Sequence, residues 1–138
     1  MNEITLPSSD GSDYLKLVNF KPDRNGVSFE IIVCSRNFTG RTWYALEATE
    51  FRSLLEGLQK MYDKFSGLAD LRLHMEPDHI HFEINSYGQV LVSGLLIDDW
   101  EDYWEEPSHG LKFGFYSDHS CLPSFIQALS LVGNEIDK

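Results

Sequence analysis

The sequence has few cysteines and no long apolar run. Two cysteines, Cys34 and Cys121, lie 87 positions apart in apolar surroundings. They are too few for a disulfide framework, so we expect both to be reduced, as in a cytosolic protein. No apolar stretch approaches the roughly 20 residues that span a bilayer. Glu3 and the absence of an apolar run after it also argue against a signal peptide. These features predict a cytoplasmic protein that does not bind membranes.

Basic residues are scarce compared with acidic ones. The chain has 11 Lys and Arg against 22 Asp and Glu, a formal net charge of −11. The imbalance lies in the second half, because residues 1–60 carry a net −1 and residues 61–138 a net −10. Phosphate binding needs Lys and Arg, so the composition argues against nucleic acid and anionic lipid as ligands, and we expect neither nucleic acid nor membrane as a partner. It favours a basic protein partner, although the solubility of the chain explains an acidic composition equally well.

Motifs of known catalytic chemistry are also lacking. The chain contains no Gly-rich phosphate loop, no zinc-finger spacing and no nucleophile elbow. Cys121 has His119 nearby and precedes a predicted helix, a position that can lower the pKa of a thiol. Helix capping and core packing explain this pair more simply. We therefore predict that the protein is not an enzyme and has no cofactor.

One pattern resembles a metal site. His79, His81 and Glu83 alternate along one predicted strand, so their side chains share a face. The same pattern is typical of the polar side of a strand whose other side is core. Neighbouring positions on that face are about 6–7 Å apart, which fits a facial ligand set poorly. A metal-dependent enzyme or metal-binding protein that uses these three residues remains the alternative function.

The hydrophobic periodicity predicts strands and two helices. Polar and apolar residues alternate in stretches that we expect to be strands at 14–20, 27–34, 41–47, 71–76, 80–84, 89–97 and 111–116. Apolar residues at helical spacing predict an amphipathic helix, with Thr49 as its N-cap and Ser66-Gly67 at its end. Its stripe consists of Phe51, Leu54, Leu55, Leu58, Met61, Tyr62 and Phe65. A second helix over 120–132 has Leu122, Phe125, Ile126, Leu129 and Val132 on one face.

Short turns between successive strands imply antiparallel neighbours. The sequence therefore predicts an α+β fold, a mostly antiparallel β-sheet of about six to seven strands with two amphipathic helices packed on one face. Residues 1–13, rich in Ser, Asp and Gly, are expected to be a flexible N-terminal segment, and 14–138 a single α+β domain. The sequence shows no internal repeat.

The stretch "GLLIDDWEDYWEEPSHGL", residues 94–111, combines negative charge with aromatic rings. Residues 98–109 contribute −6 to the net charge and contain neither Lys nor Arg. A hairpin between the flanking strands would need only two to five residues, so the extra length requires an explanation. One explanation is packing, in which Trp rings cover the sheet edge and the acids form a solvated rim.

The other explanation is recognition of a partner. Trp and Tyr are frequent at binding hot spots, and carboxylates around them attract Lys and Arg. We expect the partner-binding residues to be Asp98, Asp99, Trp100, Glu101, Asp102, Tyr103, Trp104, Glu105 and Glu106. No metal-binding residue is assigned.

Residues 27–132 resemble a known family. The run "VSGLLIDD…HGLKFGFYSDHSCLPSFIQAL", preceded by "TEFRSLLEGLQKMYDKFSGLADLRL", is similar to small bacterial immunity proteins of the WapI-like type, which are encoded beside polymorphic or contact-dependent toxins. The matching positions are Val92-Ser93-Gly94, then Leu111, Phe113 and Phe115, then Asp118, Leu122, Phe125 and Leu129. The resemblance implies a cytosolic inhibitor that binds one cognate toxin and performs no chemistry. It also implies that specificity lies in the variable insert, here the acidic stretch.

The leading hypothesis is a soluble, cytosolic protein-binding module, an immunity protein that neutralises a toxin domain through its acidic, aromatic surface. A homo-oligomeric structural protein is the third reading, because the aromatic segment could also pack against a second copy.

Overall fold

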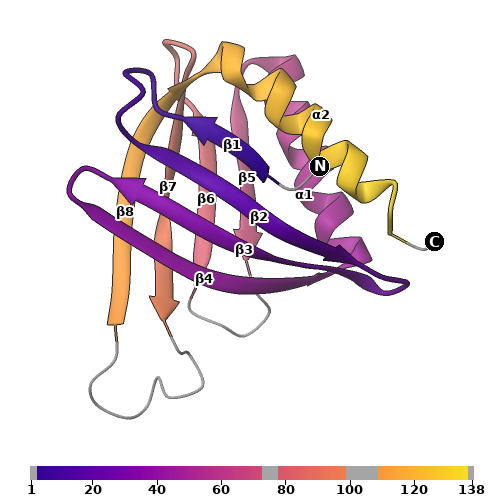
Figure 1. Ribbon diagram of the computed structural model, residues 1–138. Coiled ribbons are helices and arrows are strands. Elements are labelled where there is room, and N and C mark those ends of the chain that lie inside the picture. The colour runs from indigo at the N-terminus through magenta and orange to yellow at the C-terminus, as the bar shows by residue number, and fades with distance from the viewer. Residues whose placement is uncertain (1–2, 73–77, 99–108, 137–138) are drawn as a thin grey trace.

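The computed structural model describes residues 3–72, 78–98 and 109–136. In these ranges eight strands form two antiparallel four-stranded sheets, with the orders β1-β2-β3-β4 (sheet A) and β5-β6-β7-β8 (sheet B) (Figure 1). Sheet A consists of β1 (Glu3–Pro7), β2 (Tyr14–Pro22), β3 (Gly26–Ser35) and β4 (Phe38–Glu47), and helix α1 (Ala48–Lys64) follows it. Sheet B consists of β5 (Gly67–Arg72), β6 (His79–Ile84), β7 (Gln89–Asp98) and β8 (His109–Asp118), and the 3-10 turn η2 (His119–Cys121) and helix α2 (Leu122–Gly133) follow it.

The two halves of the chain repeat one arrangement, a four-stranded meander followed by a helix. The last two strands of each meander, β3 and β4 or β7 and β8, are all 10 residues long. Helix α1 packs mainly on β5, the first strand of the second half, and α2 packs on β1, the first strand of the first half. Because each half supplies the helix that covers the other, the halves are interlocked.

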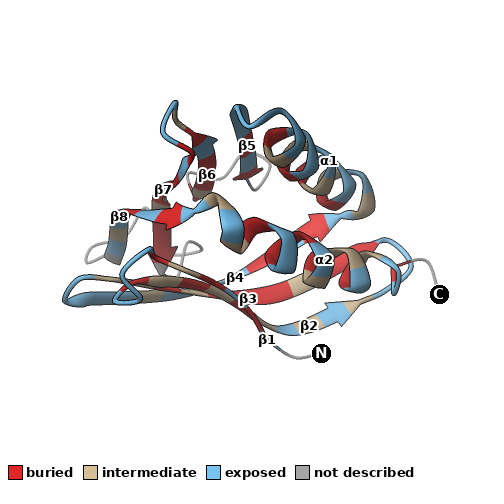
Figure 2. Cartoon of the chain, turned by 90° about the horizontal axis from the view of Figure 1, so that it is seen from above, coloured by how far each residue is buried: buried red, intermediate tan, exposed pale blue. Residues whose placement is uncertain are grey.

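The core lies between the inner faces of the two sheets and the two helices. Figure 2 shows the buried sides of the strands and helices turned towards one another. Large buried rings come from every layer, including Phe29 and Tyr44 of sheet A, Phe82 of sheet B, Phe51 of α1 and Phe125 of α2. Alternate strand residues point out of this core, so the outer face of each sheet carries the more exposed positions.

The predicted α+β class with antiparallel strands and two helices is confirmed, with eight strands in two sheets in place of six to seven in one. In α1, Phe51, Leu54, Leu58 and Met61 of the predicted stripe are buried, and in α2 all five predicted core residues are. The N-cap of α1 is Glu47, not Thr49. The helix begins earlier because the Glu50 carboxylate accepts a 2.8 Å hydrogen bond from the Glu47 N–H, half of a capping box.

The segment 1–13, expected to be flexible, contains strand β1. Ile4 and Leu6 are buried, and β1 pairs in antiparallel register with β2. The loop to β2 is closed by hydrogen bonds. The Ser8 N–H donates to the Asp13 carbonyl at 2.8 Å, and the Asp10 carboxylate accepts the hydroxyls of Ser8 and Ser12 at 2.7 Å each. Two buried side chains and this ordered loop hold β1 at the edge of sheet A. The single domain over 14–138 stays a prediction.

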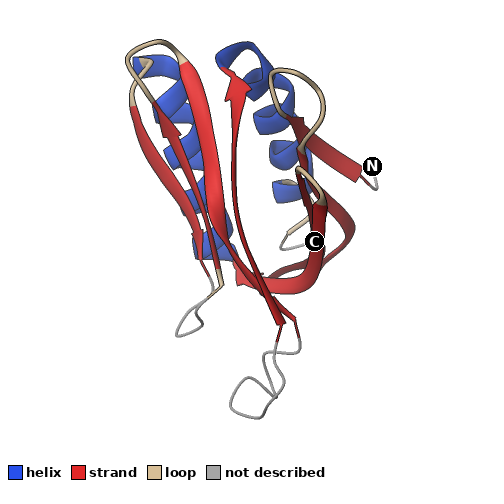
Figure 3. Ribbon diagram, turned by 90° about the vertical axis from the view of Figure 1, so that its left-hand side faces the viewer, coloured by secondary structure: helices blue, strands red, loops and turns tan. Residues whose placement is uncertain are grey.

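Two connections leave sheet B at the same end. Arg72 of β5 pairs with His79 of β6, and Asp98 of β7 pairs with His109 of β8. These strand ends lie at the bottom of Figure 1, and Figure 3 shows the two helices towards the other end. The β6–β7 turn, residues 85–88, lies at that other end of the sheet. Among the described residues, neither helix is long and apolar enough to cross a membrane.

Candidate functional site

The structure fixes where the predicted partner-binding stretch is attached. Residues 99–106 of that prediction lie outside the described residues. Asp98 is the last residue of β7, and its backbone pairs with His109, the first residue of β8. The acidic stretch therefore connects the two longest strands of sheet B at their paired ends.

The residue before this attachment point is held by two neighbouring elements. The Ile97 N–H donates to Oδ2 of Asp78 at 2.9 Å, and the Ile97 carbonyl accepts a 3.2 Å hydrogen bond from the Thr42 hydroxyl of β4. Ile97 itself is buried. Thr42 of sheet A and Asp78, the residue before β6, thus fix the end of β7. Sequence reasoning missed both contacts, since neither residue belongs to a recognisable motif.

Asp78 is a buried carboxyl group. Asp78 is only 1% exposed. Burial raises the pKa of its carboxyl group above the ordinary value for an aspartate. Its second oxygen, Oδ1, and the hydroxyl of the buried Tyr44 have no hydrogen-bond partner in the part of the chain that the structure describes. Burial is the main cause that raises the pKa of Tyr44, and the charge of Asp78 is the second. The two polar groups therefore interact inside the core.

Basic side chains lie near the attachment end on the outer face of sheet B. The cross-strand row next to that end runs from Arg72 through His79 and Leu95 to Lys112. Arg72 and Lys112 are exposed. The acidic stretch therefore extends from a strand end whose outer face carries positive charge.

The His79, His81 and Glu83 pattern forms an ion-pair cluster around His81. His81 Nδ1 lies 2.5 Å from Oδ1 of Asp70 on β5, and Nε2 lies 3.4 Å from Oε2 of Glu83. Hydrogen bonding to Asp70, and more weakly to Glu83, raises the pKa of His81 and favours the imidazolium. Both ring nitrogens thus face carboxylates. Among the described residues no group of three His, Cys, Asp or Glu is arranged to hold a metal ion.

The His81 cluster makes stability depend on pH. Because the folded-state pKa of His81 is raised, its contribution to stability is fully present below about pH 6.5 and is lost as the pH rises through the folded-state value. The carboxylates are half exposed, so we expect a contribution below about 1 kcal/mol. Urea unfolding at pH 6 and pH 9 measures it. Between pH 6 and pH 9 the His81→Gln variant should lose less stability than the wild type. An equal loss in both proteins would contradict the role of the His81 cluster in this pH dependence.

The second candidate pair, Cys121 and His119, serves the packing of α1. The His119 ring stacks on Tyr62, with centroids 4.5 Å apart, and meets the Phe65 ring edge-on at 4.4 Å. Its Nε2 lies 3.4 Å from the Tyr62 carbonyl oxygen. His119 therefore ties η2 to the end of α1. Cys121 and Cys34 are both free thiols that are partly buried.

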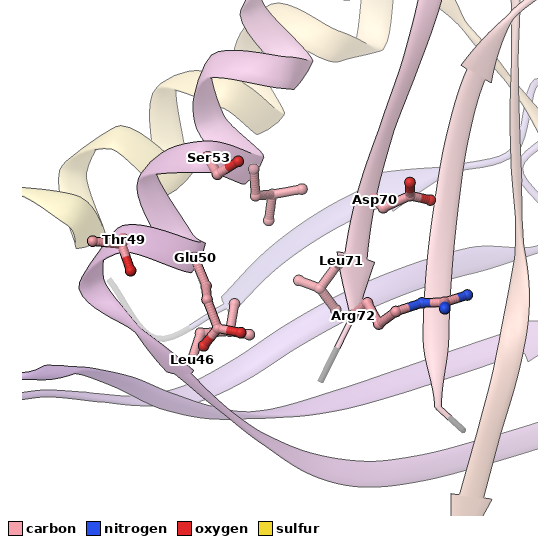
Figure 4. A pocket seen from close by; sticks show the side chains of 8 residues that line it. Leu46, Thr49, Glu50, Ser53, Asp70, Leu71 and Arg72 are labelled. Atoms are coloured by element: carbon pink, nitrogen blue, oxygen red, sulfur yellow. The ribbon is translucent and has the colours of Figure 1, made fainter. Parts of the chain in front are cut away.

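A small pocket opens between α1 and β5. It has a volume of roughly 320 Å³, with Leu46, Leu54 and Leu71 as its apolar lining. Figure 4 shows Leu71 pointing towards α1, whereas Arg72 extends away across the neighbouring strand. The polar lining residues are Thr49, Glu50, Ser53, Asp70 and Arg72. This lining contains no cysteine, histidine or glycine-rich turn that would indicate chemistry.

Comparison with solved structures supports the fold. The chain is similar to one in the structure described as "Crystal structures of trypanosoma bruciei MRP1/MRP2", with a TM-score of 0.54 and 10% sequence identity. The similarity covers 94% of this chain and 81% of the other. At this identity the likeness concerns the fold alone. Comparison with curated protein sequences gives no match.

The family model of the immunity protein WapI-like family matches residues 8–135. This range includes both helices and every strand of the two sheets except β1. It also includes the glycine of β7, the alternating phenylalanines of β8 and the start of α2, which carried the resemblance in the sequence. The chain therefore belongs to the WapI-like immunity protein family.

Proposed function

We propose that the protein is a cytoplasmic immunity protein that binds one cognate toxin through residues 98–106 and blocks it without catalysing a reaction. Family membership supports a binding role. The surface of the toxin would be basic, such as the nucleic-acid groove of a nuclease, because the segment carries six carboxylates and no base. Trp100 and Trp104 would supply apolar anchors within this charged segment.

The observation that carries this proposal is the length of the β7–β8 connection. The equivalent hairpin of the first half, β3–β4, pairs Ser35 with Phe38 and turns with only Arg36 and Asn37. Both hairpins join strands of 10 residues. Ten residues, 99–108, stand in the second hairpin where two suffice in the first. The fold does not require this extra length, which supports a role in recognition.

The fixed end of β7 supports the same role. Asp78 and Thr42 hold Ile97 directly before the acidic segment. A recognition segment binds more tightly when the residues that present it are rigid, because less conformational freedom is lost on binding.

The test is calorimetric titration with the toxin domain encoded by the neighbouring reading frame. We expect Trp100→Ala and Trp104→Ala each to weaken binding at least tenfold, about 1.4 kcal/mol. Replacing the carboxylates of residues 98–106 with amides should slow association and reduce its dependence on salt.

Two controls match these variants. Trp43→Ala removes an exposed tryptophan from the outer face of sheet A, and Glu56→Gln with Glu135→Gln removes exposed charges from the helical side. Both controls should bind as the wild type does. Unchanged affinity in both tryptophan variants and in the amide variant would reject the assignment of the site.

A further inference from the structure

Exposed apolar side chains gather at the end of sheet B opposite the acidic segment. Of the seven large hydrophobic residues exposed in the described ranges, four lie there: Phe65 (47% exposed), Leu68 (58%), Tyr87 (88%) and Tyr116 (48%). Together with the half-buried Leu91 we call them the Tyr116 patch. Clustered exposure of this kind marks an interaction site more often than scattered residues do.

Strand register places three patch residues in one row. Leu68 of β5, Glu83 of β6, Leu91 of β7 and Tyr116 of β8 are consecutive cross-strand partners on the outer face. With strands about 4.8 Å apart, this row spans about 14 Å.

The remaining two residues extend the row past the end of the sheet. Tyr87 belongs to the β6–β7 turn, which Asn85 orders by accepting the N–H groups of Tyr87 and Gln89. Phe65, at the end of α1, lies so close to this turn that a Cβ on Gly88 would meet its ring. The β6–β7 turn and the end of α1 lie together at the top of Figure 1.

A hollow adjoins the patch. It has a volume of roughly 680 Å³ and lies between the β1–β2 loop, the β3–β4 turn and strands β7 and β8, and Leu91 and Tyr116 belong to both patch and hollow. Asp10, Asp13 and Arg36 are its charged lining residues. Hydrogen bonds from the backbone and hydroxyl of Ser12 and from the Ser8 hydroxyl lower the pKa of Asp10 to about 2, so this carboxylate is ionised at neutral pH.

The charges around the patch are mainly negative. Exposed carboxylates lie beside it at Asp63, Glu83 and Asp118. The basic residues here are Lys64, next to Phe65, Arg36 in the hollow, and His81, whose ring lies 3.4 Å from the Glu83 carboxylate. Apolar anchors with an acidic border complement a segment that carries both apolar and cationic side chains. A second copy of this chain, with its net charge of −11, would be repelled.

We propose that the Tyr116 patch is a second docking surface, which binds a basic segment of a partner protein with apolar side chains on the patch and an arginine or lysine in the hollow. This site is distinct from the acidic segment, which is attached at the other end of β7 and β8, strands about 33 Å long.

The proposal can be tested by nitrogen-15 NMR titration of the full chain at physiological salt. The probes are a short synthetic peptide of alternating arginine and leucine and a matched peptide of glutamate and leucine. We expect the arginine peptide to shift the amide signals of Leu68, Leu91, Tyr116 and the 8–13 loop, and the glutamate peptide to shift none of them. The double variant Leu68→Ser, Tyr116→Ser should weaken this binding at least tenfold.

Leu131→Ser is the matched control, because it removes an equally exposed leucine from α2. It should bind as the wild type does, as should the amide variant of residues 98–106, which separates this site from the proposed toxin site. Shifts confined to residues near Asp98 and His109, equal shifts with both peptides, or self-association in the absence of peptide would each overturn the proposal. The substitutions at Leu68, Tyr116 and Leu131 change exposed side chains, so these variants should unfold within about 0.5 kcal/mol of the wild type.

Discussion

Gly94→Ala should lower the free energy of unfolding by about 3 kcal/mol. Gly94 lies in the middle of β7, where it pairs with Ile80 of β6 and Phe113 of β8. A Cβ there would overlap the His79 carbonyl oxygen and lie 3.0 Å from the Ile80 Cα. Both are backbone atoms, so β6 and β7 would have to separate, and the hydrogen bonds between them would lengthen. Urea unfolding followed by circular dichroism measures the loss.

Gly114→Ala is the matched control for this prediction. Gly114 lies on β8 of the same sheet, but a Cβ there would meet nothing closer than Ser93 Cβ at 3.8 Å. We expect a change within about 0.5 kcal/mol, in either direction. Equal destabilisation by the two substitutions would show that the close backbone approach at Gly94 is not the cause.

Arg41→Met should lower the free energy of unfolding by more than the loss of an exposed ion pair does, because it leaves a buried carboxylate without its cation. Arg41 donates from Nε to Glu30 Oε2 at 2.8 Å and from Nη2 to Oε1 at 2.7 Å, and Asn19 adds a weaker 3.3 Å contact. Glu30 is 7% exposed. Hydrogen bonding from Arg41 lowers the pKa of Glu30, so this stabilisation is present above about pH 4.5 and is lost as the pH falls through the lower folded-state value.

The pH dependence and a second ion pair test this explanation. The difference in unfolding free energy between the wild type and Arg41→Met should shrink below pH 4. Adding Glu30→Gln to Arg41→Met should recover part of the loss, since no buried charge remains. Lys16→Met removes the exposed Lys16–Glu3 pair, 3.4 Å long in the same sheet, and should cost less than about 0.5 kcal/mol. A similar cost for Lys16→Met would mean that burial of Glu30 is not decisive.

The elements with strong periodicity could be predicted from sequence. The apolar positions of α1 and α2 recur every three or four residues, and those residues form the core. Strand β1 was missed because Ile4 and Leu6 make too short an alternation to stand out among Ser, Asp and Gly. The internal repeat was missed for a related reason. It is a repeat of topology, set by strand pairing and by the exchange of helices, and no sequence period accompanies it.

The candidate sites depend on contacts between residues that are far apart in the sequence. The polar and apolar pattern of a single strand does not reveal such contacts. The sequence alone allows His81 to be a metal ligand. In the structure, strand pairing places Asp70 of β5 beside its ring. Asp78 looked like a turn residue, yet it accepts the Ile97 N–H 19 positions away. The acidic segment could be identified from its charge and length, whereas the Tyr116 patch could not. Its members come from β5, β7, β8 and two connections, and they become neighbours only through register.

Residues 99–108 join the rest of the fold at the paired ends of β7 and β8. Selection for folding and selection for binding can act on different sides of this junction. Folding depends on the interior shared by both halves, and the paired ends of β7 and β8 are complete at Asp98 and His109. All the core residues of the described ranges lie outside the interval between those two residues. Under the proposed function, a lineage could therefore acquire a new target by changing this stretch alone, while the framework that carries it is inherited intact.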